Sequence, residues 1–144
     1  MTRQQIYDIA LSFSDTLKYT APNCDIIKIF RDLGGIVLPE KSNNYLEVFK
    51  KEKFIVNCTW SMDRFAYAKA IGHYILHSNM GNPLTIKMGS VDRIEIEGNQ
   101  FAARFLLPQP EFNIKMKEWN SIYRLAVYFD IPVCMVQMII NTAI

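Results

Sequence analysis

The sequence predicts an α+β fold, in which a small antiparallel three-stranded sheet packs on helices and the C-terminal half is helical. Two observations lead to this prediction. Short β-branched or aromatic runs gather between residues 35 and 58, whereas apolar residues recur at helical spacing before and after them. Strands grouped together, with the helices outside the group, favour α+β over the alternating α/β class. The 144 residues, half of them hydrophobic, are enough for one domain spanning 1–144.

Two helices are expected before the sheet. Residues 3–19 carry apolar side chains at every third or fourth position, and Thr2 has the side chain of an N-cap. A second apolar period covers residues 22–33 and ends at the glycine pair 34–35. The first 35 residues therefore predict a helical pair that leads directly into the sheet.

Three strands and four helices are expected in the rest of the chain. Short polar segments separate the strands, which we interpret as antiparallel and place at 35–38, 45–49 and 54–58. The helical period then returns, with Pro108 ending the second of the new helices. The predicted helices cover 63–78, 92–107 and the stretch 118–143, which contains two helices meeting at residues 130–132.

Charge and cysteine content narrow the possible functions. Sixteen basic and fourteen acidic residues leave a net charge of +2, too small for the usual electrostatic binding of nucleic acid. Three cysteines without a C-x-x-C pair argue against a disulfide framework and against a structural zinc site. No apolar leader is apparent, and the longest apolar run, 131–140, is about half a membrane span. We expect a cytoplasmic protein that binds no membrane.

The last two predicted helices weakly resemble a helix-turn-helix. A DNA-reading helix needs Arg, Lys, Asn or Gln near its start. Here the second helix begins with Val133, Cys134, Met135 and Val136. We therefore expect core packing or a protein-binding surface, and no direct binding of nucleic acid.

Three segments in the second half of the chain resemble one enzyme family. Residues 64–77 read RFAYAKAIGHYILH, residues 97–108 read EGNQFAARFLLP, and residues 125–132 read LAVYFDIP. They resemble, in the same order, the R-F-x-x-A-H-E-x-G-H-Y-x-L-H, E-A-N-x-F-A-A-x-L-L-M-P and L-A-x-x-F-x-V-S segments of the ImmA/IrrE family of zinc metallo-endopeptidases. The resemblance covers about 60–144 and implies a zincin-like metallopeptidase domain; residues 1–60 match in layout alone.

The H-E-x-x-H motif of that family binds a catalytic metal. Its two histidines lie one helical turn apart and bind zinc, and the glutamate takes a proton from the metal-bound water. By the resemblance, His73 is the second histidine and Glu97 is the third ligand. Lys69 stands at the first ligand position and Ala70 at the position of the base. The motif is thus degenerate and reads K-A-x-x-H.

Both departures remove a group on which catalysis in the family depends, the first metal ligand and the general base. A lysine ammonium has three donors and no lone pair for a metal, and alanine cannot accept a proton. We therefore expect no catalytic residue intact, no bound zinc or other cofactor, and His73 and Glu97 as vestigial ligands. We further expect the ammonium of Lys69 to lie within about 4 Å of the Glu97 carboxylate, in place of the metal. The alternative is that Lys69 turns to solvent.

His77 offers a second way to assemble a metal site. With His73 it forms an i, i+4 pair, and Glu97 completes a nominal set of two histidines and one carboxylate. The residue after His73 is a tyrosine, so such a site would lack its base. We expect His77 instead to interact with the last carbonyl groups of its helix or with the helix dipole.

Two functions follow from the resemblance and the degenerate motif. The first is a catalytically inactive metallopeptidase-like protein that acts by protein binding, with a repressor or another transcription regulator of a phage or mobile element as its partner. The alternative is a zinc metallo-endopeptidase that cleaves a repressor, in a variant inactivated by lysine and alanine at positions 69 and 70. The sequence does not separate a natural loss of the motif from an engineered one.

Overall fold

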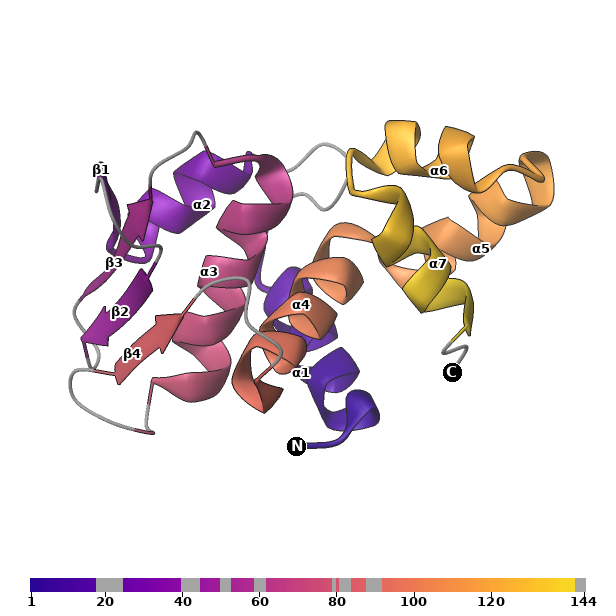
Figure 1. Cartoon of the computed structure of the whole chain (residues 1–144). Helices are drawn as coiled ribbons and strands as arrows, with labels where there is room; N and C mark the ends of the chain where they lie inside the picture. The colour runs from indigo at the N-terminus through magenta and orange to yellow at the C-terminus, as the bar shows by residue number, and fades with distance from the viewer. Residues whose placement is uncertain are drawn as a thin grey trace.

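The computed structural model describes residues 1–17, 25–39, 45–49, 53–58, 62–78, 80, 84–87 and 92–141. Within these residues, helices and strands follow one another in the predicted order of helices, strands and a mainly helical second half (Figure 1). The elements are α1 (Arg3–Asp15), α2 (Ile26–Asp32), β1 (Gly35–Pro39), β2 (Tyr45–Phe49), β3 (Lys53–Cys58), α3 (Arg64–His77), β4 (Leu84–Lys87), α4 (Arg93–Leu106), α5 (Gln109–Glu118), α6 (Ile122–Phe129) and α7 (Val133–Asn141).

The sheet differs from the predicted one in strand number and direction. Its order is β1-β3-β2-β4, with β2 antiparallel to both of its neighbours and β1 parallel to β3. The prediction of three antiparallel strands is therefore wrong, although the α+β class holds. The apolar pattern of a segment predicts that it forms a strand, but it does not predict which strand lies next to it. The fourth strand has only four residues, of which Ile86 is buried while Thr85 and Lys87 are exposed, and it is too short for the alternation to be decisive.

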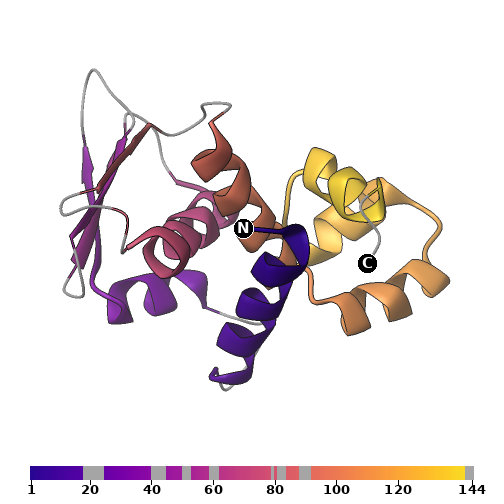
Figure 2. The ribbon, with the colours of Figure 1, turned by 90° about the horizontal axis from the view of Figure 1, so that it is seen from below.

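The two helices of the resemblance pack closely along one another. In Figure 2, α2 and α3 lie beside one face of the sheet, α4 and α1 lie beyond them, and α5–α7 gather at the far end. A glycine on each helix allows the close approach. A Cβ atom added to Gly72 on α3 would lie 2.7 Å from the Phe101 ring, and one added to Gly98 on α4 would lie 2.6 Å from the His73 ring. Any larger residue at either position would push the helices apart.

The C-terminal part contains one helix that the sequence analysis missed. Helix α5 begins after Pro108, with Pro110 in its first turn, where the missing N–H has no helical partner to lose. The predicted junction at 130–132 is confirmed, because α6 ends at Asp130 in the left-handed conformation with φ 54°. Among the described residues no single helix has the length and apolarity to cross a membrane; α6 and α7 meet that test only together, bent by 113°.

Candidate functional site

Helix α3 places three polar side chains on one face. The helix begins at Asp63, whose carboxylate accepts a hydrogen bond from the N–H of Ala66 at 2.8 Å. Lys69, His73 and His77 then follow at intervals of four residues, one turn apart. Both histidines are buried, with exposed fractions of 0% and 1%, and the lysine side chain is 12% exposed. Polar groups so deeply buried require partners, which α4 supplies.

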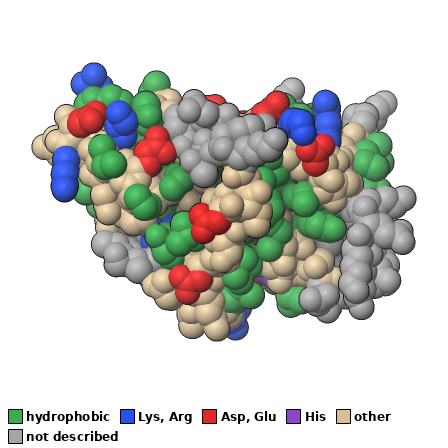
Figure 3. All heavy atoms as spheres, turned by 180° about the vertical axis from the view of Figure 1, so that it is seen from behind, with side chains coloured by type: hydrophobic (Ala, Val, Ile, Leu, Met, Phe, Trp, Pro, Cys, Tyr) green, Lys and Arg blue, Asp and Glu red, His purple; other side chains and the backbone are tan. Residues whose placement is uncertain are grey.

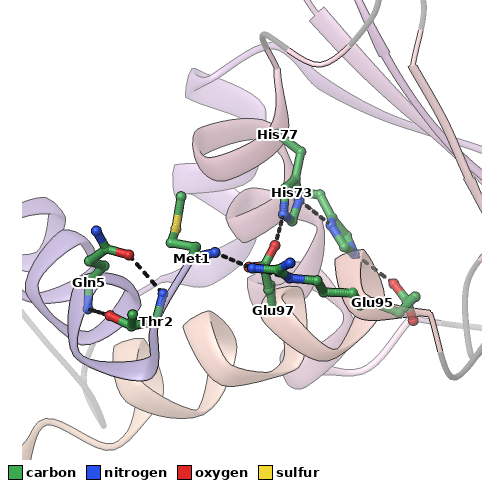
Figure 4. A network of polar contacts seen from close by, with 8 residues as sticks. Met1, Thr2, Gln5, His73, His77, Glu95 and Glu97 are labelled. Atoms are coloured by element: carbon green, nitrogen blue, oxygen red, sulfur yellow. Dashed lines mark hydrogen bonds and ion pairs between the residues drawn. The ribbon is translucent and has the colours of Figure 1, made fainter.

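Two glutamates of α4 complete a continuous series of contacts. Lys69 Nζ lies 3.0 Å from Glu95 Oε2, and Glu95 Oε1 lies 2.6 Å from His73 Nε2. The Nδ1 atoms of His73 and His77 are 2.9 Å apart, and His77 Nε2 lies 3.0 Å from Glu97 Oε1 (Figure 4). We refer to these five residues as the polar chain.

The outer end of the polar chain meets further positive charge. Glu97 Oε2 lies 3.3 Å from the amino group of Met1 and 3.7 Å from Arg93 Nε. The inner carboxylate, Glu95, is 1% exposed and pairs with the lysine. Each carboxylate of the polar chain therefore has at least one cation, which offsets the cost of burying its negative charge.

The two histidines carry a limited number of hydrogens for these contacts. A neutral imidazole donates from one ring nitrogen and accepts at the other. If His73 and His77 donate their Nε2–H groups to Glu95 and Glu97, both Nδ1 atoms are acceptors 2.9 Å apart, so that contact needs one further proton.

Burial and hydrogen bonding shift the pKa values within the polar chain. Burial lowers the pKa of His73, and the hydrogen bond and negative charge of Glu95 oppose that effect without overcoming it. Burial would raise the pKa of Glu97, but hydrogen bonds from His77 and from the Met1 amino group outweigh it and leave that pKa below its ordinary value. The fold thus favours a neutral His73 and an ionised Glu97.

Two contact predictions from the sequence are wrong. The ammonium of Lys69 contacts Glu95 rather than Glu97, and the ring nitrogens of His77 contact His73 and Glu97 rather than the last carbonyl groups of its helix. Positions 95 and 97 are two residues apart, so their side chains point in directions about 200° apart around α4. The sequence motif contains only the second of the two glutamates. Nothing in the spacing alone indicated that the first one faces Lys69.

The residues present do not fit the zinc ion that the motif implies. Zinc binds nitrogen at about 2.0–2.1 Å, so two nitrogens on one tetrahedral ion lie about 3.3 Å or more apart. The Nδ1 atoms of His73 and His77 are closer than this, at 2.9 Å, and His73 Nε2 is occupied by Glu95. Among the residues that the structure describes, no group of three or more His, Cys, Asp or Glu could hold a metal. Lys69 adds a positive charge at the place where a ligand is needed.

Helix packing fixes the His73 ring against α4. The Cβ of any residue larger than glycine at position 98 would lie 2.6 Å from two atoms of that ring. Ala70, at the position of the base, is fully buried in the core and contributes a methyl group. The polar chain is therefore held by packing on both sides, and its described contacts pair charges.

Comparison with known proteins gives one match that covers this site. The model of a family described as Peptidase_M78, the IrrE N-terminal-like domain, matches residues 60–141. The matched stretch contains α3, α4 and every member of the polar chain. A search of the curated proteins found no match.

Proposed function

The chain belongs to the family of IrrE N-terminal-like domains, as its motifs predicted, and we propose that it is a catalytically inactive member that acts by binding protein. A single observation carries the proposal of inactivity. The ammonium of Lys69 lies 3.0 Å from a carboxylate that is 1% exposed, so a cation built into the chain neutralises the acidic side chain closest to His73. Zinc could enter only by displacing that ammonium.

The missing base supports the same conclusion independently. A metallo-endopeptidase needs a group that takes the proton of its nucleophilic water. The side chain at that position is the methyl group of Ala70, enclosed in the core at 0% exposure. The described carboxylates nearby, Glu95 and Glu97, are each engaged with a histidine and a cation. Loss of the base would abolish hydrolysis even if a metal were present.

We propose that the bound partner is a repressor or another transcription regulator of a phage or mobile element, the partner that the family resemblance implies. A segment of that partner can add to the edge of the sheet as a further strand, since an edge strand offers backbone groups for pairing. Strand β1 forms one edge, and three of its apolar side chains are 37–44% exposed: Ile36, Val37 and Leu38. This edge suits an extended, apolar peptide.

Surface charge favours a protein partner over nucleic acid. On the face drawn in Figure 3, basic and acidic side chains of the described residues are interspersed, with hydrophobic side chains between them. The net charge of the chain is only +2. Binding of nucleic acid depends chiefly on a concentrated basic surface.

The alternative, an active endopeptidase inactivated at positions 69 and 70, is disfavoured by a further departure from the family pattern beside His73. The pattern has alanine where this chain has Gly98, and the His73 ring fills the space of the missing Cβ. A deliberate change of two residues leaves position 98 untouched. The coincidence of three departures around one histidine supports a natural loss of the metal site.

Affinity capture from the native host tests the proposed binding. The unsubstituted protein is compared with Val37→Lys on the β1 edge and with Thr85→Lys, a matched control on the opposite edge. We expect a regulator to be captured intact by the unsubstituted protein and by Thr85→Lys, and to be lost with Val37→Lys. Cleavage of the captured regulator by the unsubstituted protein would contradict the proposal.

A further inference from the structure

A second polar site lies apart from the polar chain, between α1, α4 and α7. It is a cavity of about 180 Å³, and the described residues that line it are Arg3, Ile96, Gln100, Arg104 and Met138. Positions 96, 100 and 104 follow at intervals of four and form one stripe along α4. The cavity therefore uses a different face of α4 from the one that bears Glu95.

The deeper arginine of this cavity is held in place by its neighbours. Arg104 is 7% exposed, its Nη1 donates a hydrogen bond to Gln109 Oε1 at 2.7 Å, and its guanidinium carbon lies 5.3 Å from the centre of the Tyr7 ring. Burial lowers the pKa of Arg104, and the positive charge of Arg3 lowers it further. Two guanidinium groups thus approach the same cavity closely enough to repel one another.

We propose that this cavity binds an oxyanion, a carboxylate or phosphate group carried on a short apolar stem. The planar donors of arginine match the oxygens of both groups and can bind them in pairs. The described residues that line the cavity include two arginines and no Asp or Glu.

The shape and surroundings of the cavity agree with such a ligand. Arg3 is the first residue of α1, a helix of 13 residues, so the positive end of the helix dipole adds to the field at that side. Ile96 and Met138 give the cavity an apolar wall. A volume of about 180 Å³ equals roughly six waters in the liquid, which holds an oxyanion and a few carbon atoms.

Calorimetric titration of the whole protein with inorganic phosphate and, separately, with N-acetylaspartate tests the site and identifies the group. Binding of phosphate alone assigns a phosphate group, and binding of N-acetylaspartate alone assigns a carboxylate; binding of both supports a general oxyanion site. Absence of binding by either compound at about 10 mM would overturn the proposal.

Variants on accessible positions locate the binding. We expect Arg3→Gln to weaken the observed binding about tenfold, because one charge-assisted donor pair is lost. The control Arg31→Gln removes the same charge from an exposed position on α2 and should leave the affinity unchanged. The proposed site would be contradicted if both variants bound the anion equally weakly, or if Arg3→Gln bound it as tightly as the unsubstituted protein.

A substitution that adds a negative charge to the cavity distinguishes a ligand-binding role of the two arginines from a purely structural one. Gln100→Glu introduces a carboxylate into the wall of the cavity that both arginines also line. We expect it to abolish binding of the anion and at the same time to raise the melting temperature, since the built-in carboxylate takes the place of the ligand. A variant that still binds the anion, or that melts at a lower temperature, would refute the assignment.

Discussion

Replacing Lys69 with alanine should destabilise the fold far more than the loss of an ordinary surface ion pair. The change removes the ammonium that pairs with Glu95, a side chain only 1% exposed. Breaking a buried pair from one side costs about 3–5 kcal/mol. Because the Lys69 side chain is 12% exposed and partly hydrated, we expect the lower end, about 3 kcal/mol. Urea unfolding at pH 7 should show a midpoint about 1–2 M lower than that of the unsubstituted protein.

A matched control shows whether burial or the nitrogen–oxygen distance determines the cost of losing an ion pair. Lys28 Nζ lies 2.6 Å from Asp32 Oδ2, closer than in the Lys69 pair, but both side chains are more than 60% exposed. Lys28→Ala should therefore cost less than about 1 kcal/mol. Adding Glu95→Gln to Lys69→Ala should recover part of the lost stability, because a neutral amide needs no cation. Equal losses for Lys69→Ala and Lys28→Ala, or no recovery in the double variant, would refute this reasoning.

Three further predictions concern the same region. Gly98→Ala should lower the unfolding free energy by about 1–3 kcal/mol in urea, since the new Cβ meets the His73 ring at 2.6 Å; the gain of about 1 kcal/mol usual for this change in a helix would contradict the packing. The melting temperature should fall with acidification, first below about pH 6.5. Below that pH the unfolded chain takes up a proton on His73, whereas the folded protein, in which the pKa of His73 is lowered, does not. It should fall again below about pH 4.5, as the depressed pKa of Glu97 is approached, and a rise of stability in acid would exclude both effects. With zinc present, Lys69→His should melt at a higher temperature than Lys69→Ala, since histidine offers a ligand; equal melting temperatures would show that no metal site forms.

The elements that carry the site were predictable from sequence because their signals are local. Helical periodicity gave α3 within one residue at each end, and Pro108 marked the end of α4. Helix α5 was missed although Pro110 in its first turn is a helix-start signal. Strand pairing was not predictable, since the parallel partnership of β1 with β3 depends on residues distant in sequence.

The chemistry of the site was predictable only in part, for a geometric reason. The sequence identified Lys69 and His73 and predicted an ion pair to a carboxylate of the second helix. The choice of Glu95 over Glu97 depends on the rotation of α4, which packs closely against α3 at Gly72 and Gly98. Such a rotation cannot be obtained from motif spacing, because the motif contains only Glu97.

Zinc content of the unsubstituted protein tests most directly the claim that Lys69 stands in place of a metal. The purified protein is incubated with zinc chloride, desalted and measured by mass spectrometry of the metal, and its melting temperature is recorded with and without a chelator. We predict zinc far below one ion per chain and a melting temperature that the chelator does not change, because the ammonium and the paired histidines leave no ligand set. One tightly held zinc per chain, with a melting temperature that falls by several degrees on chelation, would contradict the claim.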